Sequence, residues 1–273
     1  MSSERDAVCC PPPPPPPPPP LIPIILSNSL HLTRRFTETR DCQKIPEQEL
    51  LEARNRLWER EGTQDPPYIS YYRYIKPVLQ DGPTCGLVAL CMASSCTSSP
   101  LSEEQLLLEA RARGFTNHGE MFSVDDMATL ARDMLEKNCR EVEVLSGGLG
   151  QDKEYVLQKL KSDSILLIPY DADANDAPCC RRGHKAHWAV VSGVIISATS
   201  QHTCHLLARQ GKSRHLAVWS YEELQRSNEN LMEMDPGRAT DGRSYILPPG
   251  GVAAGLCGRA ILLHDLGISH PSL

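Results

Sequence analysis

The change from helical to β-type patterning along the chain constrains its fold more than any other feature. Apolar residues recur at helical spacing in the first half, whereas the second half consists of short apolar runs separated by turn residues. The expected helices cover residues 46–58, 85–96, the segments after Ser102 and Ser123, and residues 153–161 and 221–231. The expected strands cover 142–145, 165–168, 188–196, 205–207, 216–219 and 260–263. Helices first and strands later predict an α+β domain with a cleft between the two parts.

Several of these helices carry start and stop signals. Pro46 suits a first helical turn, and Gly62 suits a helix end. Three patterns are typical of helix N-caps: Ser102 with Gln105, Ser123 with Asp126, and Ser220 with Glu223. These signals place the starts of three helices within a residue or two.

A turn-forming run rich in glycine and proline leads directly into the helix that begins at Cys85, within QDGPTCGLVAL at residues 80–90. The unpaired N–H groups and the positive end of the dipole at a helix N-terminus favour a negative charge. We therefore expect the pKa of this thiol to be lowered, which makes Cys85 the candidate nucleophile. Cys91 and Cys96 on the same helix are expected to be inert.

A base and an oxyanion donor accompany this cysteine in the sequence. His187 opens a β-type run in GHKAHWAVVSG at residues 183–193, where a sheet can hold its imidazole rigidly; His184, in the preceding loop, is its nearest rival. The side-chain amide of Gln80 can fold back beside the sulfur and form an oxyanion hole with the backbone N–H of Cys85. A cysteine followed by a histidine at the start of a buried strand is the order found in papain-like thiol hydrolases.

The group that orients the imidazole is not evident from the sequence. An Asp or Asn on the strands after the histidine usually has this role. Neither residue type occurs between Trp188 and Ser227. Gln210 is the best substitute, and a backbone carbonyl is an equal alternative.

The motifs Gln-x4-Cys-Gly and His-Trp-Ala-Val-Val-x-Gly resemble the papain-like superfamily, and within it the peptidases related to bacteriocin-leader processing. The chain more closely resembles the actin maturation protease family. The blocks that carry this resemblance are GPTCGLVAL (82–90), GEMFSV (119–124), LIPYD (167–171), GHKAHWAV (183–190), QGKS (210–213) and RATDGR (238–243). The first and fourth blocks are the most specific.

The resemblance implies a papain-like α+β fold, in which the helical part carries Cys85 and packs against an antiparallel sheet that carries His187. It implies a cysteine aminopeptidase that removes the N-acetylated initiator residue, Met or Cys, from immature actin. Actin is then the substrate, and no metal or organic cofactor is required. Two other functions stay open: a polyproline-bearing adaptor with an inactive thiol-hydrolase domain, and a thiol hydrolase that acts on ubiquitin-like tails.

Ten consecutive prolines, Pro11–Pro20, dominate the N-terminal region. Such a run adopts polyproline II and extends about 31 Å at roughly 3.1 Å per residue. It is either a semi-rigid spacer or a docking peptide for SH3, WW or profilin modules, and the resemblance to the actin family favours profilin. We expect residues 1–45 to form a disordered tail and residues 46–273 to form the peptidase domain.

The net charge and the cysteines restrict which partners the chain can bind and in which compartment it acts. A net charge of −6 over 273 residues argues against a general affinity for nucleic acid or acidic membranes. The 11 cysteines are odd in number, and the N-terminus lacks a signal-peptide pattern, so we expect a cytoplasmic protein. We also expect the chain to act as a monomer. The apolar run at residues 21–26 is too short to span a bilayer.

Three basic residues lie just before the expected base. Arg181, Arg182 and Lys185 are expected to flank the histidine wall of the cleft and to steer an acidic substrate, or else to form an ordinary solvated loop. Acidic residues follow the initiator residue of actin, the substrate that the resemblance implies. No metal site is expected here, because the adjacent Cys179 and Cys180 lack a second pair at ligand spacing.

Overall fold

The computed structural model describes residues 44–62, 68–197 and 203–267. The proline run and the remainder of the expected tail up to residue 43 lie outside these residues, so the boundary at residue 45 stays a prediction. Within the described part, no helix is both long and apolar enough to cross a membrane.

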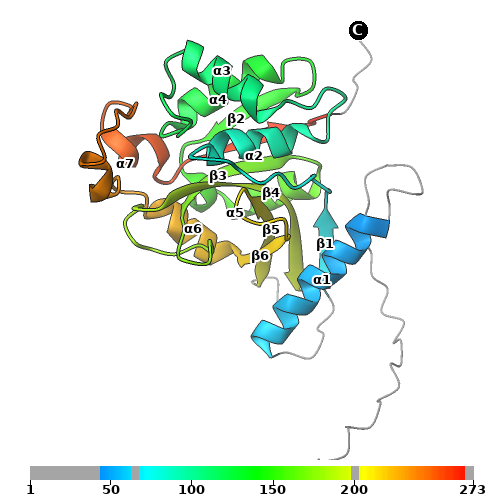
Figure 1. The fold of residues 1–273 in the computed structure, drawn as a ribbon. Helices are drawn as coiled ribbons and strands as arrows, with labels where there is room; N and C mark the ends of the chain where they lie inside the picture. Colours follow the sequence, from blue (N-terminus) through cyan, green and yellow to red (C-terminus); the bar gives the residue numbers. More distant parts are fainter. Residues whose placement is uncertain (1–43, 63–67, 198–202, 268–273) are drawn as a thin grey trace, which may run out of the picture. The chain divides into compact units, whose positions relative to one another are not determined.

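An antiparallel sheet of seven strands forms the centre of the described fold (Figure 1). The strands follow the order β2-β7-β3-β4-β5-β6, and β1 pairs with the second half of β4. They are β1 Tyr68–Tyr72, β2 Glu141–Leu145, β3 Ile165–Asp171, β4 Ala186–Ser197, β5 Cys204–Gln210, β6 Ala217–Ser220 and β7 Ala260–His264. Six of the seven strands were predicted from the sequence. Strand β1 was not, because its tyrosines can pack into a core equally well from a loop.

Helices cover both faces of this sheet. The helices are α1 Lys44–Glu61, α2 Cys85–Ser94, α3 Glu103–Ala112, α4 Val124–Met134, α5 Lys153–Lys161, α6 Tyr221–Glu229 and α7 Gly251–Leu256. Helices α2, α3, α4 and α7 belong to the core on one face, whereas α5 and α6 belong to the core on the other (Figure 1). The prediction of an α+β fold, with a helical part packed against an antiparallel sheet, is confirmed.

Alternation along the strands explains these two cores. In β3, Ile165 and Leu167 point into the core beneath α2, whereas Leu166 and Ile168 point into the core beneath α5 and α6. All seven residues of this strand are buried. A strand covered on both faces reads as a continuous apolar run, which is why its sequence does not alternate.

A third, smaller core joins α1 to the sheet beside β1. Leu50 and Leu57 of α1 pack there against strand residues, and the rings of Trp58 and Tyr68 stack with centroids 6.3 Å apart. Arg209 of β5 is fully buried at this junction. This third core packs α1 against β5, the strand that ends at the candidate site.

The predicted helix ends are confirmed. Ser102 forms both halves of a capping box with Gln105, and Ser123 and Ser220 each accept a hydrogen bond from the backbone N–H three residues later. Gly62 donates to the carbonyl of Trp58 and has a φ of 62°, the left-handed conformation that glycine adopts most readily. Local capping chemistry therefore sets these boundaries.

Candidate active site

Cys85 is the first residue of α2, as the sequence predicted. The preceding residue, Thr84, gives the helix no side-chain cap, because its hydroxyl contacts the carbonyl of Asp81 and the carboxylate of Glu103 instead. The N–H groups in the first turn of a helix have no partner within the helix. They therefore stay available beside the sulfur for a developing negative charge.

His187 lies at the start of β4, directly opposite Tyr170 of β3. The two rings meet edge to face, with centroids 5.7 Å apart and an interplanar angle of 84°. Tyr170 is fully buried and donates its hydroxyl to the carbonyl of Asp176, 2.8 Å away, so it forms a fixed support for the imidazole. The side chain of Gln210, at the end of β5, is a hydrogen-bond partner of the same imidazole.

Cys85 and His187 line one cleft with a volume of about 750 Å³. The cysteine comes from the helical part and the histidine from the sheet, as predicted from the order of the patterns. Within the described residues, no group hydrogen-bonds Nε2 of His187, although this atom is buried. Buried nitrogens normally have a partner, so this atom is free to accept a proton in the cleft.

Gln80 lines the same cleft and is held at both ends. Its backbone N–H donates to the carbonyl of Gly211, 2.8 Å away, and its side-chain Nε2 donates to the carbonyl of Gly82, 2.7 Å away. Gly211 also leaves room for the amide, because a Cβ at that position would lie 2.7 Å from Oε1 of Gln80. The turn that follows β5 thus supports Gln80 as well as His187.

Burial controls the protonation of the two central groups. Loss of water raises the pKa of the Cys85 thiol, and the N–H groups of Trp188 and Gly86 oppose this shift only in part. The expected lowering of this pKa is therefore corrected, since desolvation outweighs the helix N-terminus. Burial also lowers the pKa of His187 to about 4. At neutral pH the pair is an uncharged thiol beside an uncharged imidazole.

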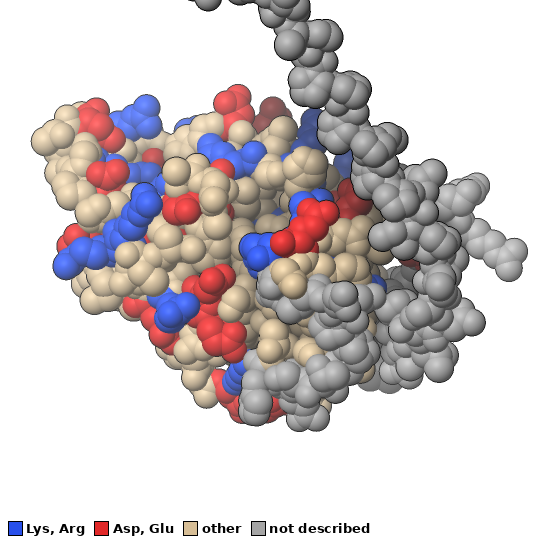
Figure 2. Space-filling view, turned by 90° about the horizontal axis from the view of Figure 1, so that it is seen from below, with Lys and Arg blue, Asp and Glu red and all other residues tan. Residues whose placement is uncertain are grey.

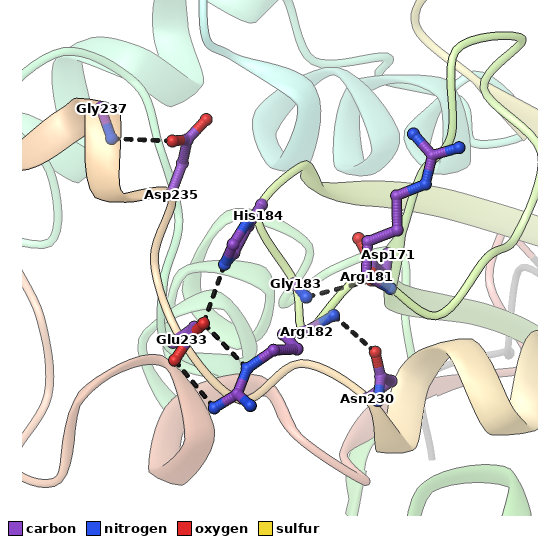
Figure 3. A network of polar contacts seen from close by, with 9 residues as sticks. All are labelled: Asp171, Arg181, Arg182, Gly183, His184, Asn230, Glu233, Asp235 and Gly237. Carbon is purple, nitrogen blue, oxygen red and sulfur yellow. Dashed lines mark hydrogen bonds and ion pairs between the residues drawn. The ribbon is translucent and has the colours of Figure 1, made fainter.

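The three basic residues of the loop between β3 and β4, Arg181, Arg182 and Lys185, differ in position. Arg181 and Lys185 line the cleft, whereas Arg182 does not. The guanidinium of Arg182 pairs with the carboxylate of Glu233 through two contacts of 2.8 and 3.0 Å. Figure 3 shows this pair, with the side chain of Arg181 pointing away from it. The expectation that Arg182 flanks the cleft is therefore corrected, because Glu233 holds it elsewhere.

His184 is also held by Glu233, through Nε2 at 2.8 Å (Figure 3). It lines the cleft, but its imidazole nitrogen is occupied by a carboxylate. His187 has no such partner on Nε2 in the described part of the chain. This difference separates the two histidines, which the sequence distinguished only by their place in a loop or a strand.

Asp171 anchors the loop between β3 and β4. It is fully buried, and its carboxylate accepts the backbone N–H groups of Arg181 and Gly183. A buried carboxylate is stable when several N–H donors satisfy it. The loop that leads into His187 therefore has a fixed path, which the sequence did not indicate.

The sequence also did not indicate the roles of Tyr170, Gly211 and Lys212 in this site. Tyr170 and Gly211 support His187 and Gln80, and Lys212 lines the cleft. Each lies within a block of the family resemblance, but its role depends on which strands are neighbours. No group of three or more metal-binding side chains occurs among the described residues.

Comparison with known proteins places this arrangement among peptidases. A family model described as the C-terminal domain of actin maturation protease-like proteins matches residues 75–195. The human actin maturation protease is 41% identical over 240 residues, which cover 74% of this chain and 68% of the human protein. The zebrafish (Danio rerio) protein is 41% identical over 241 residues, covering 76% and 78%. The Drosophila melanogaster protein is 39% identical over 203 residues, covering 74% and 73%.

One solved structure is also similar, that of a putative C39-like peptidase from Bacillus anthracis. It covers 69% of this chain and 94% of its own, at 14% identity and a TM-score of 0.39.

The described fold packs the cysteine-bearing helix against one face of an antiparallel sheet, and the relatives are named as proteases. The protein is a peptidase with an α+β fold. Identity of about 41% over three quarters of the chain then decides the family: the chain belongs to the actin maturation protease family.

Proposed function

We propose that this protein is a cysteine aminopeptidase that removes the N-acetylated initiator residue, Met or Cys, from immature actin. The observation that supports the proposal most is the meeting of Cys85 and His187, from opposite walls, in one cleft. The substrate comes from the names of the relatives, which are actin maturation proteases. Sequence motifs and geometry alone support only a thiol hydrolase.

The reaction begins with two uncharged groups. The imidazole of His187 accepts the proton of the Cys85 thiol as the sulfur attacks the carbonyl carbon of the initiator residue. The imidazolium then gives this proton to the leaving amine, which becomes the new N-terminus of actin. Water, deprotonated by His187, hydrolyses the remaining thioester and releases the acetylated amino acid.

The oxyanion of the tetrahedral intermediate is stabilised by the backbone N–H of Cys85 and the side-chain amide of Gln80. The Nε2 of Gln80 has two hydrogens, and the contact with Gly82 uses one of them. The second hydrogen remains for the oxyanion. Gln210 and the ring of Tyr170 orient the imidazole, in place of the usual Asp or Asn.

The direct test of this function is mass spectrometry of acetylated actin N-terminal peptides incubated with the full chain. We expect loss of the initiator residue from the acetylated peptide and no cleavage further along it. A ubiquitin-like peptide ending in glycine serves as the competing substrate. Cleavage of that peptide alone, or of neither peptide, would overturn the proposed function.

The pKa of His187, which burial lowers, sets an unusual acid limit on activity. Because its pKa in the free protein is about 4, the imidazole stays neutral, and able to accept the thiol proton, down to about that pH. We expect kcat/KM to fall as the pH drops through about 4, rather than through the ordinary histidine value of 6.5.

Stability must be followed in the same pH range. The unfolded chain binds a proton at this histidine below pH 6.5, but the folded chain does so only below about 4, so acid favours unfolding in this interval. Circular dichroism at each pH separates unfolding from titration. An acid limit near 6.5 in a fully folded sample would contradict the assignment.

Replacement of Gly211 by alanine is expected to lower kcat about 10²-fold. The added methyl would lie 2.7 Å from Oε1 and 3.0 Å from Cβ of Gln80, which must then leave its position. Loss of one oxyanion donor costs about 10²–10³ in kcat. Gly237→Ala is the control, since its new Cβ would lie 3.2 Å from Oδ1 of Asp235 and would not contact Gln80.

A double variant shows whether the effect acts through Gln80. The activity of Gly211→Ala with Gln80→Ala should equal that of Gln80→Ala alone. A further loss in the double variant would mean that Gly211 acts in another way.

We also propose that the chain acts in the cytoplasm and binds profilin through Pro11–Pro20. This run lies outside the described residues, so the proposal depends on the sequence and the family. Binding of profilin to the full chain and to a chain with alternating Pro→Ala substitutions at residues 11–20 would decide it. Equal affinities would favour the role of a spacer.

A further inference from the structure

The acidic side chains that line the cleft are all engaged. Glu120 contacts the guanidinium of Arg238 at 3.4 Å. Asp173 and Asp235 accept backbone N–H groups in their own turns, including those of Asn175 and Gly237 at 2.7 and 2.8 Å. Of the three, Glu120 is paired with a cation, whereas neutral N–H donors hold the two aspartates within their own turns.

Two of the four Lys and Arg side chains in the cleft are engaged as well. Lys185 pairs with the carboxylate of Asp176 at 2.7 Å and contacts the carbonyl of Asp173 at 2.6 Å. Arg238 pairs with Glu120 and lies over the rings of Phe122 and Tyr245. Each of these cations has a partner before any substrate enters.

Arg181 and Lys212 remain. Both side chains are exposed and line the cleft, and neither has a polar or ionic side-chain contact with another described residue. Their backbones are fixed, since the N–H of Arg181 donates to buried Asp171 and the N–H of Lys212 donates to Oε1 of Gln210. A fixed backbone with a free charged end is suited to recognition, because only the side chain must be ordered on binding.

The two residues reach the cleft from different loops. Arg181 lies between β3 and β4, and Lys212 follows β5. The strands β3, β4 and β5 are neighbours, so both loops emerge at the edge of the sheet where His187 lies. On the face drawn in Figure 2, charges of both signs are interspersed. Arg181 and Lys212 thus bring to the cleft two positive charges that have no ion-pair partner among the described residues, in a chain of net charge −6.

We propose that Arg181 and Lys212 form a carboxylate-binding pair that selects peptides with acidic residues directly after the scissile bond. The inference rests on the proposed function and adds the residues that set its specificity. It also replaces the expected trio, because Lys212 takes the place of Arg182 and Lys185 has its charge compensated by Asp176.

Lys212 also acts on the reacting groups through space. Its positive charge favours the thiolate of Cys85 and disfavours the imidazolium of His187. A carboxylate bound to Lys212 would weaken both effects, so it would not favour the attack of the sulfur. The selectivity for acidic peptides is therefore expected in peptide binding, before the sulfur attacks.

The test measures peptide binding without turnover. Full-length Cys85→Ala protein is titrated with two N-acetylated peptides that differ only in having Asp–Asp or Asn–Asn after the initiator residue, and the Kd values are compared. We expect the acidic peptide to bind more than tenfold more tightly. Each of Arg181→Ala and Lys212→Ala should reduce this preference about fivefold, the size of a single ion pair at a solvated site.

Arg214→Ala is the matched control, because Arg214 is an exposed cation on the same turn that does not line the cleft. It removes the same charge and should leave the preference unchanged, whereas Lys212→Arg should retain it. An unchanged preference in the Arg181→Ala/Lys212→Ala double variant would overturn the pair. Selective binding of the acidic peptide without its cleavage by the wild-type chain would instead count against the proposed function alone.

Discussion

Replacing Cys85 by alanine is expected to lower kcat for peptide cleavage by about 10⁴-fold or more, while the unfolding free energy changes little. Loss of a catalytic nucleophile has effects of this size in hydrolases of similar mechanism. Cys85 lines the cleft and packs only in part against the core beneath α2, although its thiol is desolvated. Alanine removes only the sulfur atom, so we expect the rest of this core to stay packed.

Two further variants make this result specific. Cys91→Ala, on the same helix, removes a thiol that donates to the carbonyl of Leu101, and it should retain activity because it does not line the cleft. The double variant Cys85→Ala/His187→Ala should be no less active than Cys85→Ala alone, since the two groups act as one unit. Residual activity above about 1% in Cys85→Ala would assign the nucleophile elsewhere.

Replacing Glu49 by alanine is expected to lower the unfolding free energy by about 3–5 kcal/mol. Its carboxylate accepts hydrogen bonds from the buried guanidinium of Arg209 and from the hydroxyl of Tyr72. Arg209 is fully buried, so removal of the carboxylate leaves a charge without its counterion. Urea unfolding of both proteins measures the difference.

Glu52→Ala on the same helix is the control. Glu52 is exposed, and its only hydrogen bond within the described residues comes from Gln48, so its loss should cost at most about 0.5 kcal/mol. Exchange of both members of the buried pair, Glu49→Leu with Arg209→Met, should recover much of the stability. Equal midpoints for Glu49→Ala and the wild-type chain would show that α1 does not contribute to the cooperative fold.

This buried pair also bears on the site. Arg209 immediately precedes Gln210, the partner of the His187 imidazole, and its Nη1 donates to the carbonyl of Arg214, 2.9 Å away. The guanidinium of Arg209 therefore holds the turn at residues 210–214, and its charge is neutralised by Glu49 of α1. Loss of Glu49 should loosen this turn before the whole fold melts, which amide hydrogen exchange at residues 210–214 would detect.

The sequence by itself determined the elements and the candidates for chemistry. Helical and β-type spacing predicted the α+β order, and serine caps placed three helix starts, because both are properties of neighbouring residues. Signals from neighbouring residues likewise placed Cys85 at the start of a helix and His187 at the start of a strand.

Only the tertiary structure decided how these groups are supported and charged. Strand order brings Tyr170 and Gln210 to His187, and Gly211 to Gln80, across 17 to 131 residues of chain. Burial reversed the expected pKa shift of the thiol, and Glu233 removed Arg182 from the cleft. Desolvation and pairing depend on what surrounds a side chain, and folding brings those surroundings from distant parts of the sequence.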